Sequence, residues 1–387
     1  MKFNWKEEKL GTLVRFSSGG TPNKRNPNYW NGTIPWISAK NMKTEVIETS
    51  DLCITEEGLA HGSKLAPSGS LLLLVRGSGL FNAIPICYVK NAVAYNQDVK
   101  CIESVSEVEN KYLFYWLKAS SGYIQKKLEF TSIGAGKIDT SFLSQLVVRF
   151  PDKKTREKIV AFADNVSNQI NLNTRINENL SDQIQTIYSN KFDAATHTPS
   201  GILADICSYS SDRIPVSELS VSTYFSTENM QPNKMGSVNA TSLPSIMQTT
   251  GCHKGDVLIS NIRPYFKKIV YVTDDSCGCS TDVLCFVPKE DQYSAFLFGT
   301  LYMDRFFDYM VAGSKGTKMP RGDKQQIMNY PVVLPDKESL DLFNGLIVPM
   351  LDQIATNRIE SNRLVALRDA LLPKLMSGEL DVSELDL

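Results

Sequence analysis

Two matched loops carry side chains that suit phosphate binding. The first, residues 131–137, combines hydroxyl groups and glycines and ends in a lysine, and the second, residues 313–321, is of the same kind. Glycines allow backbone N–H groups to approach a phosphate closely, and lysine and arginine supply the opposite charge. The alternative interpretation is a pair of solvated turns. The candidate DNA-binding residues in these loops are Thr131, Ser132, Gly134, Gly136, Lys137, Lys315, Thr317, Lys318 and Arg321.

A second pair of loops follows two equivalent strand-like runs, at residues 76–79 and 263–268. Arginine is the side chain best suited to guanine, because its fork matches two acceptors on that base. A third basic stretch lies in the turn-rich segment 18–25, with two tryptophans, Trp30 and Trp36, that we expect in the core rather than stacked on bases. The candidates here are Arg76, Ser78, Arg263, Lys267, Lys268, Lys24 and Arg25.

No motif that would support catalysis accompanies these loops. The nearest approach to the element with which adenine methyltransferases hold a flipped base is Asn261–Tyr265, which lacks the second proline. No phosphate loop, zinc-protease helix or serine-hydrolase elbow occurs, and the three histidines are scattered. We therefore predict a non-catalytic chain with no catalytic residues.

The cysteines do not form a recognisable metal site. Cys252, Cys277, Cys279 and Cys285, with His253, could be drawn as a zinc cluster, but the spacing fits no usual finger. Buried free thiols are the favoured interpretation, and no metal is expected. The N-terminus has no apolar signal core and no run of 18 apolar residues occurs, so we expect a soluble, cytoplasmic protein.

Charge is distributed unevenly along the chain. The net charge is −1, but residues 1–150 hold 18 Lys and Arg against 13 Asp and Glu, while residues 336–387 hold 5 against 10. A basic beginning and an acidic end favour a DNA-facing part and a protein-facing part.

The chain is a weak repeat of itself, with a period of roughly 180–190 residues. Each half has a long mixed segment, 1–150 or 200–335, with short β-branched or aromatic runs and one helix-like stretch near its end. The predicted strands include Leu71–Val75, Ala83–Val89, Lys268–Val272 and Val283–Val287, and the predicted helices are Lys111–Lys127 and Tyr293–Val311. The matched motifs are Pro67–Leu73 with His253–Ile259, Gly136–Ile138 with Thr317–Met319, and Val147–Asp152 with Val332–Asp336.

A long helix is predicted after each mixed segment. Residues 153–192 contain no Gly and no Pro, and Asp152 is a suitable N-cap. Forty helical residues make a rod of roughly 60 Å. The second helix is less regular, because Gly345 and Pro349 lie near its start and Pro373 should kink or end it. The apolar seam positions are Ile159, Phe162, Val166, Ile170, Ile176, Leu180, Ile184 and Ile187 in the first helix and Leu342, Leu346, Met350, Ile354, Leu364, Leu367, Leu371, Leu372 and Leu375 in the second.

A lone rod with one apolar seam is unstable in water, so the two seams are expected to pack together. The alternative is two unrelated surface helices, which leaves the repeat unexplained. The predicted fold is α+β: two similar mixed α/β domains separated by a long antiparallel two-helix, coiled-coil-like spacer. The expected boundaries are 1–151, 152–195, 196–335 and 336–378, with a tail at 379–387.

Several local motifs resemble one known family. Trp5-Lys6 leads into Leu10-Gly11 and then Gly19–Pro22, and Ile34–Ile37 is followed by Asn41. Tyr224–Met230 resembles a variant of the same opening in the second half, and Arg368–Leu380 resembles the family's terminal signature. These motifs together are similar to the DNA specificity subunit of type I restriction–modification systems.

The resemblance implies that each mixed segment is a target recognition domain for one half of a split DNA site, with the helical spacer fixing the gap. It implies partners: two DNA adenine methyltransferase subunits and translocase–nuclease restriction subunits. S-adenosylmethionine, ATP and Mg would be used by those partners and none bound by this chain. One departure is that the first spacer ends at Lys191–Asp193 without the Leu-Leu-Pro-Lys-Leu motif. The rivals are the recognition part of a self-contained methyltransferase or nuclease, and a helical scaffold that binds only proteins.

Overall fold

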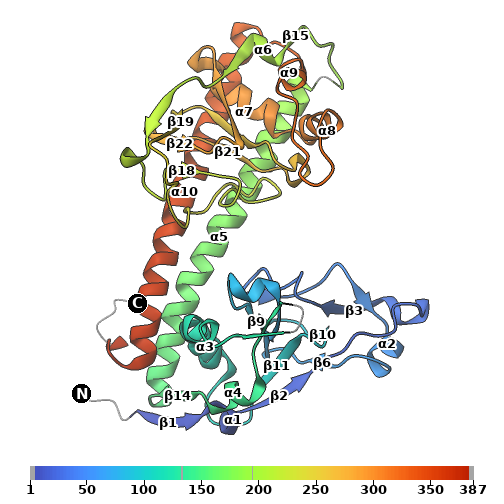
Figure 1. The fold of residues 1–387 in the computed structure, drawn as a ribbon, viewed down its shortest axis with the longest axis vertical. Coiled ribbons are helices and arrows are strands. Elements are labelled where there is room, and N and C mark those ends of the chain that lie inside the picture. Colours follow the sequence, from blue (N-terminus) through green and yellow to red (C-terminus); the bar gives the residue numbers. More distant parts are fainter. Residues whose placement is uncertain (1–4, 132–133, 194, 383–387) are drawn as a thin grey trace. The chain divides into compact units, whose positions relative to one another are not determined.

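The computed structural model describes residues 5–131, 134–193 and 195–382. The chain divides into two compact units (Figure 1): unit 1 is residues 1–168 with 365–387, and unit 2 is residues 169–364. Two long helices each contribute to both units. None of the helices in the described residues has the length and apolar character that crossing a membrane requires.

Unit 1 is built on a five-stranded sheet of order β2-β11-β7-β9-β4. Its central strand, β7, is four leucines that are all buried, as expected for a strand covered on both faces. Helix α3 (Asn110–Gln125) packs on β9 and buries an aromatic and leucine face, which confirms the predicted helix. The strands are β2 (Val14–Ser18), β4 (Val46–Ile47), β7 (Leu71–Leu74), β9 (Ile86–Val89) and β11 (Val99–Ser104).

Smaller sheets complete unit 1. A four-stranded sheet has the order β5-β3-β10-β6, with β10 parallel to β3, and β1 pairs with β14. The strands are β1 (Lys6–Lys9), β3 (Trp30–Ile37), β5 (Cys53–Ile54), β6 (Leu65–Ala66), β10 (Val93–Tyr95) and β14 (Val147–Phe150), and the short helices are α1 (Leu10–Leu13), α2 (Glu56–Ala60) and α4 (Thr140–Gln145).

Unit 2 has two four-stranded sheets, of order β16-β23-β20-β21 and β17-β19-β22-β18, with β15 paired to β24. The strands are β15 (Gly201–Ile202), β16 (Cys207–Tyr209), β17 (Arg213–Pro215), β18 (Tyr224–Phe225), β19 (Gln248–Cys252), β20 (Val257–Ser260), β21 (Ile269–Tyr271), β22 (Cys277–Cys279), β23 (Val283–Pro288) and β24 (Pro331–Val332). The short helices α6 (Leu203–Ile206) and α9 (Lys324–Met328) flank them.

The single helix predicted over residues 293–311 is wrong in one respect, because the structure has two helices there. Helix α7 (Ser294–Tyr302) and helix α8 (Asp304–Ala312) are separated by Met303, whose backbone is extended at φ −65° and ψ 138°. All residues of α7 after Ser294 are buried. A helix that is apolar on every side has no periodic seam whose interruption would mark its end.

The two units share a topology, which confirms the internal repeat. Strands β16-β23-β20-β21 follow the order of β2-β11-β7-β9, and β18 runs parallel to β22 as β3 does to β10. The same turn follows each of these parallel strands. The Ser38 N–H donates to the Asn41 Oδ1 at 3.1 Å, and the Ser226 N–H donates to the Asn229 Oδ1 at 2.6 Å. The units are therefore two variants of one domain.

Helix α5 (Lys153–Phe192) spans 40 residues, as predicted. Helix α10 (Lys337–Ser377) spans 41 residues and continues past Pro373. The expectation that this proline could end the helix is therefore wrong. Proline removes a single N–H from the helical ladder. Leu372, Leu375 and Met376 are buried on both sides of that position, and their packing keeps the last turn helical.

The buried stripe of α10 differs from the predicted seam. Leu342 and Leu346 are more than half exposed and Leu367 is 46% exposed, so the prediction that these three residues lie in the buried seam is wrong. The stripe at the start of α10 faces an aromatic core in unit 2 and not only α5, which moves it by one position. The buried residues there are Leu340, Phe343, Ile347, Leu351 and Ile354.

The remaining seam predictions hold to different degrees. Ile159, Phe162, Val166 and Ile184 on α5 and Ile354, Leu372 and Leu375 on α10 are buried. Ile170, Leu180, Met350, Leu364 and Leu371 are half-buried.

Within unit 2 the two helices are antiparallel (Figure 1). Asn173 on α5 donates to the Glu360 carboxylate at 2.8 Å, and Asn357 donates to Asn177 Oδ1 at 2.8 Å. Advancing along α5 from Asn173 to Asn177 thus moves backward along α10, from Glu360 to Asn357. The expected pairing of the seams is confirmed here, with a polar layer at Asn173.

All eight cysteines lie within the described residues and are free thiols, seven of them buried. Among the described residues, no group of three or more His, Cys, Asp and Glu side chains is placed to hold a metal ion.

Candidate nucleic-acid interface

In unit 1 the two loops predicted separately form one small sheet. Strands β8 (Arg76–Gly77), β13 (Gly136–Lys137) and β12 (Glu129–Phe130) have the order β12-β13-β8, with Lys137 opposite Arg76. Thr131 closes the loop, since its hydroxyl accepts from the Ala135 N–H at 3.0 Å. Ser132 lies outside the described residues. Residues 76–79, 129–131 and 134–137 are therefore one surface, which we call basic sheet 1.

Unit 2 brings the matching loops together in the same way. Arg321 forms antiparallel bridges with Ile262 and with Lys315, and the Arg263 N–H donates to the Pro320 carbonyl at 2.8 Å. We call residues 261–267 with 313–321 basic sheet 2. These two isolated bridges, from Arg321 to Lys315 and from Arg321 to Ile262, stand where the strands β12, β13 and β8 pair in unit 1.

The structure corrects one sequence match between the loops. Asp139 caps α4 by accepting from the Ser141 N–H, and Asp323 caps α9 by accepting from the Gln325 N–H. Each Asp follows the inner strand of its basic sheet by two residues. Lys137 therefore corresponds to Arg321 and not to Lys318, because the second loop is longer than the first.

The exposed basic side chains of the two basic sheets differ in whether they have an acidic partner. Arg76 is exposed and has no acidic partner among the described residues, and the same holds for Lys318. Lys137 lies 3.4 Å from Glu129, Lys315 lies 2.5 Å from Asp323, and Arg321 lies 2.8 Å from Asp282. Exposed ion pairs of this kind are weak, so these side chains exchange readily to a phosphate.

Two candidate lysines have partners inside the protein. Lys267 and Lys234 both bind the Asp304 carboxylate, at 2.9 and 2.7 Å, and hold the pKa of Asp304 below its ordinary value despite partial burial. Lys268 donates to the Thr227 carbonyl at 2.5 Å. The structure thus gives these lysines a role in holding the loop.

Arg263 has a strained backbone, at φ 52° in the left-handed region, and Lys267 has the same conformation at φ 51°. Within the described residues the Arg263 Nε is buried without a hydrogen-bond partner, and its Nη2 reaches the Lys318 carbonyl only at 3.5 Å. Strain and an unsatisfied polar atom are features that collect at functional sites.

The third basic stretch is an exposed loop held by tryptophans. Trp30 Nε1 donates to the Asn23 carbonyl at 3.2 Å, and Trp36 Nε1 donates to the Gly20 carbonyl at 3.0 Å. Trp36 is buried, as predicted, and Trp30 packs edge-on against it. A Cβ at Gly20 would lie 2.3 Å from the Gly62 carbonyl oxygen, so only glycine fits. Lys24 and Arg25 are exposed on this loop.

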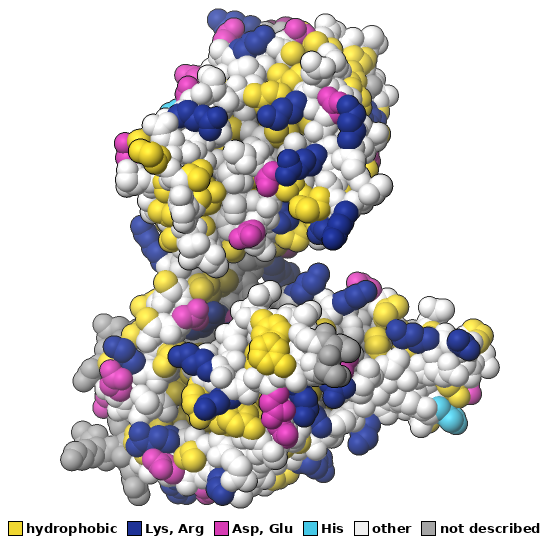
Figure 2. Space-filling model, in the orientation of Figure 1, with side chains coloured by type: hydrophobic (Ala, Val, Ile, Leu, Met, Phe, Trp, Pro, Cys, Tyr) yellow, Lys and Arg dark blue, Asp and Glu magenta, His cyan; other side chains and the backbone are white. Residues whose placement is uncertain are grey.

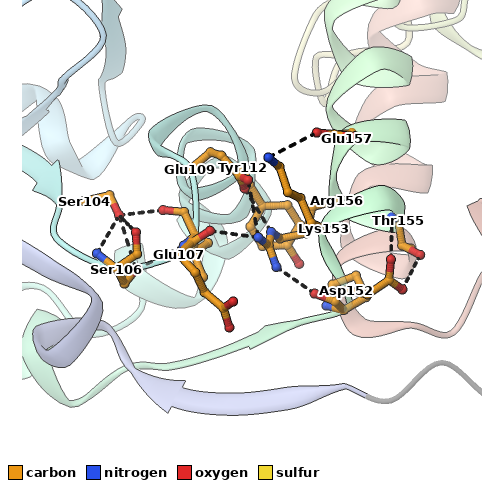
Figure 3. Close-up of polar contacts among 12 residues, drawn as sticks. Ser104, Ser106, Glu107, Glu109, Tyr112, Asp152, Lys153, Thr155, Arg156 and Glu157 are labelled. Atoms are coloured by element: carbon orange, nitrogen blue, oxygen red, sulfur yellow. Dashed lines mark hydrogen bonds and ion pairs between the residues drawn. The ribbon is translucent and has the colours of Figure 1, made fainter.

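A buried arginine network joins the start of α5 to the body of unit 1 (Figure 3). Arg156 binds the Glu109 carboxylate through Nε at 2.9 Å and Nη2 at 3.3 Å. It also donates to the Pro151 carbonyl at 2.9 Å and the Glu107 carbonyl at 2.8 Å. The guanidinium is thereby almost fully satisfied. Sequence analysis missed this residue, although Arg156 lies three positions before Ile159, in phase with the apolar seam.

A second network lies at the other end of the helix pair in unit 1. Glu45 binds both Lys118 and Arg368, and Ser167 on α5 donates to the same carboxylate at 3.3 Å. Burial opposes ionisation of Glu45, but the charges of Lys118 and Arg368 outweigh it and keep the pKa of Glu45 below its ordinary value. Arg368 thus has a structural role inside the terminal signature.

Comparison with known proteins agrees with this arrangement. Residues 3–182 match the model of the type I restriction modification DNA specificity domain. The chain is 32% identical over 162 residues to the type I restriction enzyme EcoR124I/EcoR124II specificity subunit of Escherichia coli, a match that covers 41% of the chain and 40% of that relative. The chain thus matches less than half of that relative's length.

Two further relatives match nearly end to end. The chain is 25% identical over 436 residues to the type I restriction enzyme MjaIX specificity subunit of Methanocaldococcus jannaschii, covering 99% of the chain and 95% of the relative. The fold is similar, with a TM-score of 0.56 at 15% identity, to the crystal structure of a type I restriction–modification S subunit from M. genitalium, covering 97% and 96% of the two chains. Residues 3–182, just under half of the chain, thus match the type I restriction modification DNA specificity domain, and the chain is similar nearly end to end in sequence to one type I specificity subunit and in fold to another.

Proposed function

We propose that this chain is a type I restriction–modification specificity subunit and that it reads a split site on duplex DNA, one half with basic sheet 1 and the other with basic sheet 2. The observation that carries the proposal is the duplication itself. Two units of one topology bring the same two loops together, through a three-stranded sheet in unit 1 and through two isolated bridges in unit 2, each with arginine or lysine side chains. A protein that reads two half-sites needs two equivalent surfaces with different side chains, since base choice depends on the side chains at base edges.

The helix pair, α5 with α10, is proposed to fix the gap between the half-sites. Each helix is unbroken and contributes to both units. Their antiparallel contacts in unit 2 set their register there. We therefore expect the gap to follow the length of these helices and the half-sites to follow the loops.

We infer that the chain is non-catalytic and binds no cofactor. Methyl transfer to adenine with S-adenosylmethionine, and cleavage with ATP and Mg, are assigned to partner methyltransferase and translocase–nuclease subunits. The free cysteines suit a reducing, cytoplasmic setting. Calorimetric titration of the purified chain with S-adenosylmethionine checks the assignment, and heat of binding to the chain alone would favour the rival self-contained methyltransferase.

Methylation mapping tests the proposed recognition. The chain is co-expressed with its methyltransferase partner, and methylated adenines are located genome-wide in the host. Arg76→Gln should relax sequence choice in one half-site and Arg321→Gln in the other, because each removes one charged side chain from one sheet. Arg15→Gln, on an exposed position of β2, is the matched control. Relaxation of the same half-site by both substitutions would contradict the proposal.

A further inference from the structure

Each basic sheet carries a pair of exposed aromatic rings. In unit 1 the rings of Phe81 and Phe130 are stacked with centroids 5.2 Å apart, and Phe130 is 76% exposed. In unit 2 the rings of Tyr265 and Phe266 lie 4.8 Å apart, and Tyr265 is 49% exposed. Burying such a ring is ordinarily favourable, and the free protein leaves that gain unrealised at these positions.

Phe81 of the first pair and the Tyr265–Phe266 pair occupy equivalent places in the shared topology, whereas Phe130 lies on β12. Phe81 ends a 3-10 turn, η2 (Ser78–Phe81), between β7 and β9. Tyr265 and Phe266 lie in a 3-10 turn, η4 (Pro264–Phe266), between β20 and β21, the counterparts of those strands. One exposed apolar residue is common on any surface. The same exposure in both copies of the domain indicates a shared requirement.

The protein holds the rings of unit 1 in place. Gln125, at the end of α3, donates to the carbonyls of Leu80 and Phe81 at 3.2 and 2.8 Å. A Cβ added at Gly136 would lie 3.2 Å from the Leu80 Cβ and 3.5 Å from the Phe81 Cζ, so the absent side chain leaves room for the ring. Gly136 therefore has a packing role in addition to the phosphate contact that its sequence context predicts.

The rings of unit 2 are held by backbone contacts. The Asn233 N–H donates to the Phe266 carbonyl and the Lys234 N–H to the Lys267 carbonyl, both at 2.8 Å. Arg263 and Lys267, on either side of the turn, both have positive φ. A turn fixed at both ends presents its rings without further ordering, which lowers the entropy lost on binding.

Basic side chains lie near both pairs, and the acidic Glu129 precedes Phe130 in β12. Phe130 lies opposite Gly136 and beside Lys137, with Arg76 on the next strand. Tyr265 and Phe266 follow Arg263 after one proline, and the Arg263 N–H donates to the carbonyl of Pro320, the residue before Arg321. Figure 2 shows hydrophobic side chains interspersed with lysine and arginine and with some aspartate and glutamate side chains on the surface drawn. Aromatic rings amid cations are typical of nucleic-acid surfaces, whereas protein–protein interface cores are depleted of charge.

We propose that Phe81–Phe130 and Tyr265–Phe266 contact the bases of duplex DNA and supply the apolar part of recognition. This inference rests on the proposed function and extends it to residues outside the predicted set. The rings pack on base surfaces such as thymine methyl groups, while Arg76, Lys137, Arg263 and Arg321 bind phosphates and polar base edges. Ring contacts release no counterions, so their contribution is independent of salt, unlike that of the basic side chains.

Binding measured across a salt series tests the inference. The full chain in complex with its methyltransferase partner is titrated with a duplex that carries its mapped site and with a random duplex. Phe130→Ala and Tyr265→Ala should each weaken specific binding roughly tenfold at every salt concentration, with the salt slope unchanged. Arg76→Gln should instead reduce the slope. Tyr123→Ala in unit 1 and Met247→Ala in unit 2, exposed residues outside the basic sheets, are the matched controls.

The outcomes separate the possible occupants. Unchanged DNA affinity in both ring variants, with an unaltered thermal midpoint, would overturn the inference and leave the proposed function standing. So would a loss of DNA binding that follows a loss of methyltransferase from the complex, because the rings would then bind protein. If the unsubstituted complex does not distinguish its mapped site from the random duplex, the proposed function itself fails and this inference with it.

Discussion

The two units begin their long helices with the same cap and with different chemistry beneath it. Asp152 accepts from the Thr155 N–H at 3.1 Å, and Asp336 accepts from the Ser339 N–H at 2.7 Å. Four residues after each cap, unit 1 has Arg156, buried in a network of carbonyls and Glu109. Unit 2 has Leu340, buried in a core rich in aromatic rings.

The difference shows how a weak sequence repeat coexists with a shared topology. The cap fixes where the helix starts. The buried residue four positions later then needs surroundings that match its chemistry. An apolar side chain does so by packing, and an arginine does so with acceptors for each N–H group. We call the contacts that anchor the start of each long helix a joint, polar in unit 1 and aromatic in unit 2. The two joints should respond differently to substitution.

The largest effect is expected in the aromatic joint of unit 2. Phe343 is fully buried against Tyr188, Phe192 and Phe296, with ring centroids 5.5 to 6.3 Å apart. Phe343→Ala should lower the free energy of local unfolding of unit 2 by about 3–5 kcal/mol, as measured by native-state hydrogen exchange. Leu342→Ala, one residue away and more than half exposed, should change it by less than about 0.5 kcal/mol. Equal effects of the two would contradict the corrected stripe.

A smaller effect is expected in the polar joint of unit 1. Arg156→Met leaves the Pro151 and Glu107 carbonyls without their donor and Glu109 without its counter-charge. We expect a loss of about 2–4 kcal/mol in the local unfolding free energy of unit 1, reduced by the partial exposure of Glu109. Hydrogen exchange of the amides around Asp152 provides the measurement, with exposed Arg175→Met on the same helix as control. If Arg156→Met leaves the exchange rates unchanged, the Arg156 network does not stabilise the start of α5.

The polar layer between the helices in unit 2 gives the next effect. Asn173 is 2% exposed and donates to Glu360 and Ser361 of α10. Asn173→Leu should cost about 1–2 kcal/mol, because Glu360 loses a buried donor while apolar contact increases. A shift in the urea midpoint of unit 2 that exceeds the shift caused by exposed Asn179→Leu checks this expectation. Equal midpoints for the two variants would mean that the layer adds no stability.

The smallest effect concerns pH in unit 1. The pKa of Glu45 is lowered in the folded state, so its ionised form contributes stability above the unfolded pKa of about 4.3 and loses it as pH falls through the lower folded pKa. Glu45→Gln should therefore destabilise unit 1 at neutral pH and make progressively less difference below about pH 4. Thermal midpoints across pH provide the test, with exposed Glu48→Gln as control. A difference that stays constant down to pH 2 would remove the ion pairs as the cause.

The sequence alone located the long helices and the repeat, because both depend on short stretches of neighbouring residues. The absence of Gly and Pro between residues 153 and 192, with Asp152 before them, determines helix α5. The repeat survives at caps and buried strands such as β7 and β20, where few residue types fit.

Tertiary contacts decided what the sequence analysis missed. Leu346 and Ile347 are equally apolar, and only the position of the core of unit 2 selects Ile347 for burial. The meeting of the Arg76 and Lys137 loops is a contact across about 60 residues of chain, which no local pattern contains. Which of the exposed basic side chains touch DNA stays a prediction.

The most direct test of the proposal that the helix pair fixes the gap between the half-sites lengthens both helices together. Four residues inserted after Asn173 in α5 and four after Asn357 in α10 add roughly 6 Å, about the rise of two base pairs. Methylated sites are then mapped in a host that carries the lengthened chain and its methyltransferase partner. The account predicts a longer gap between two unchanged half-sites. Unchanged half-sites with an unchanged gap would contradict it.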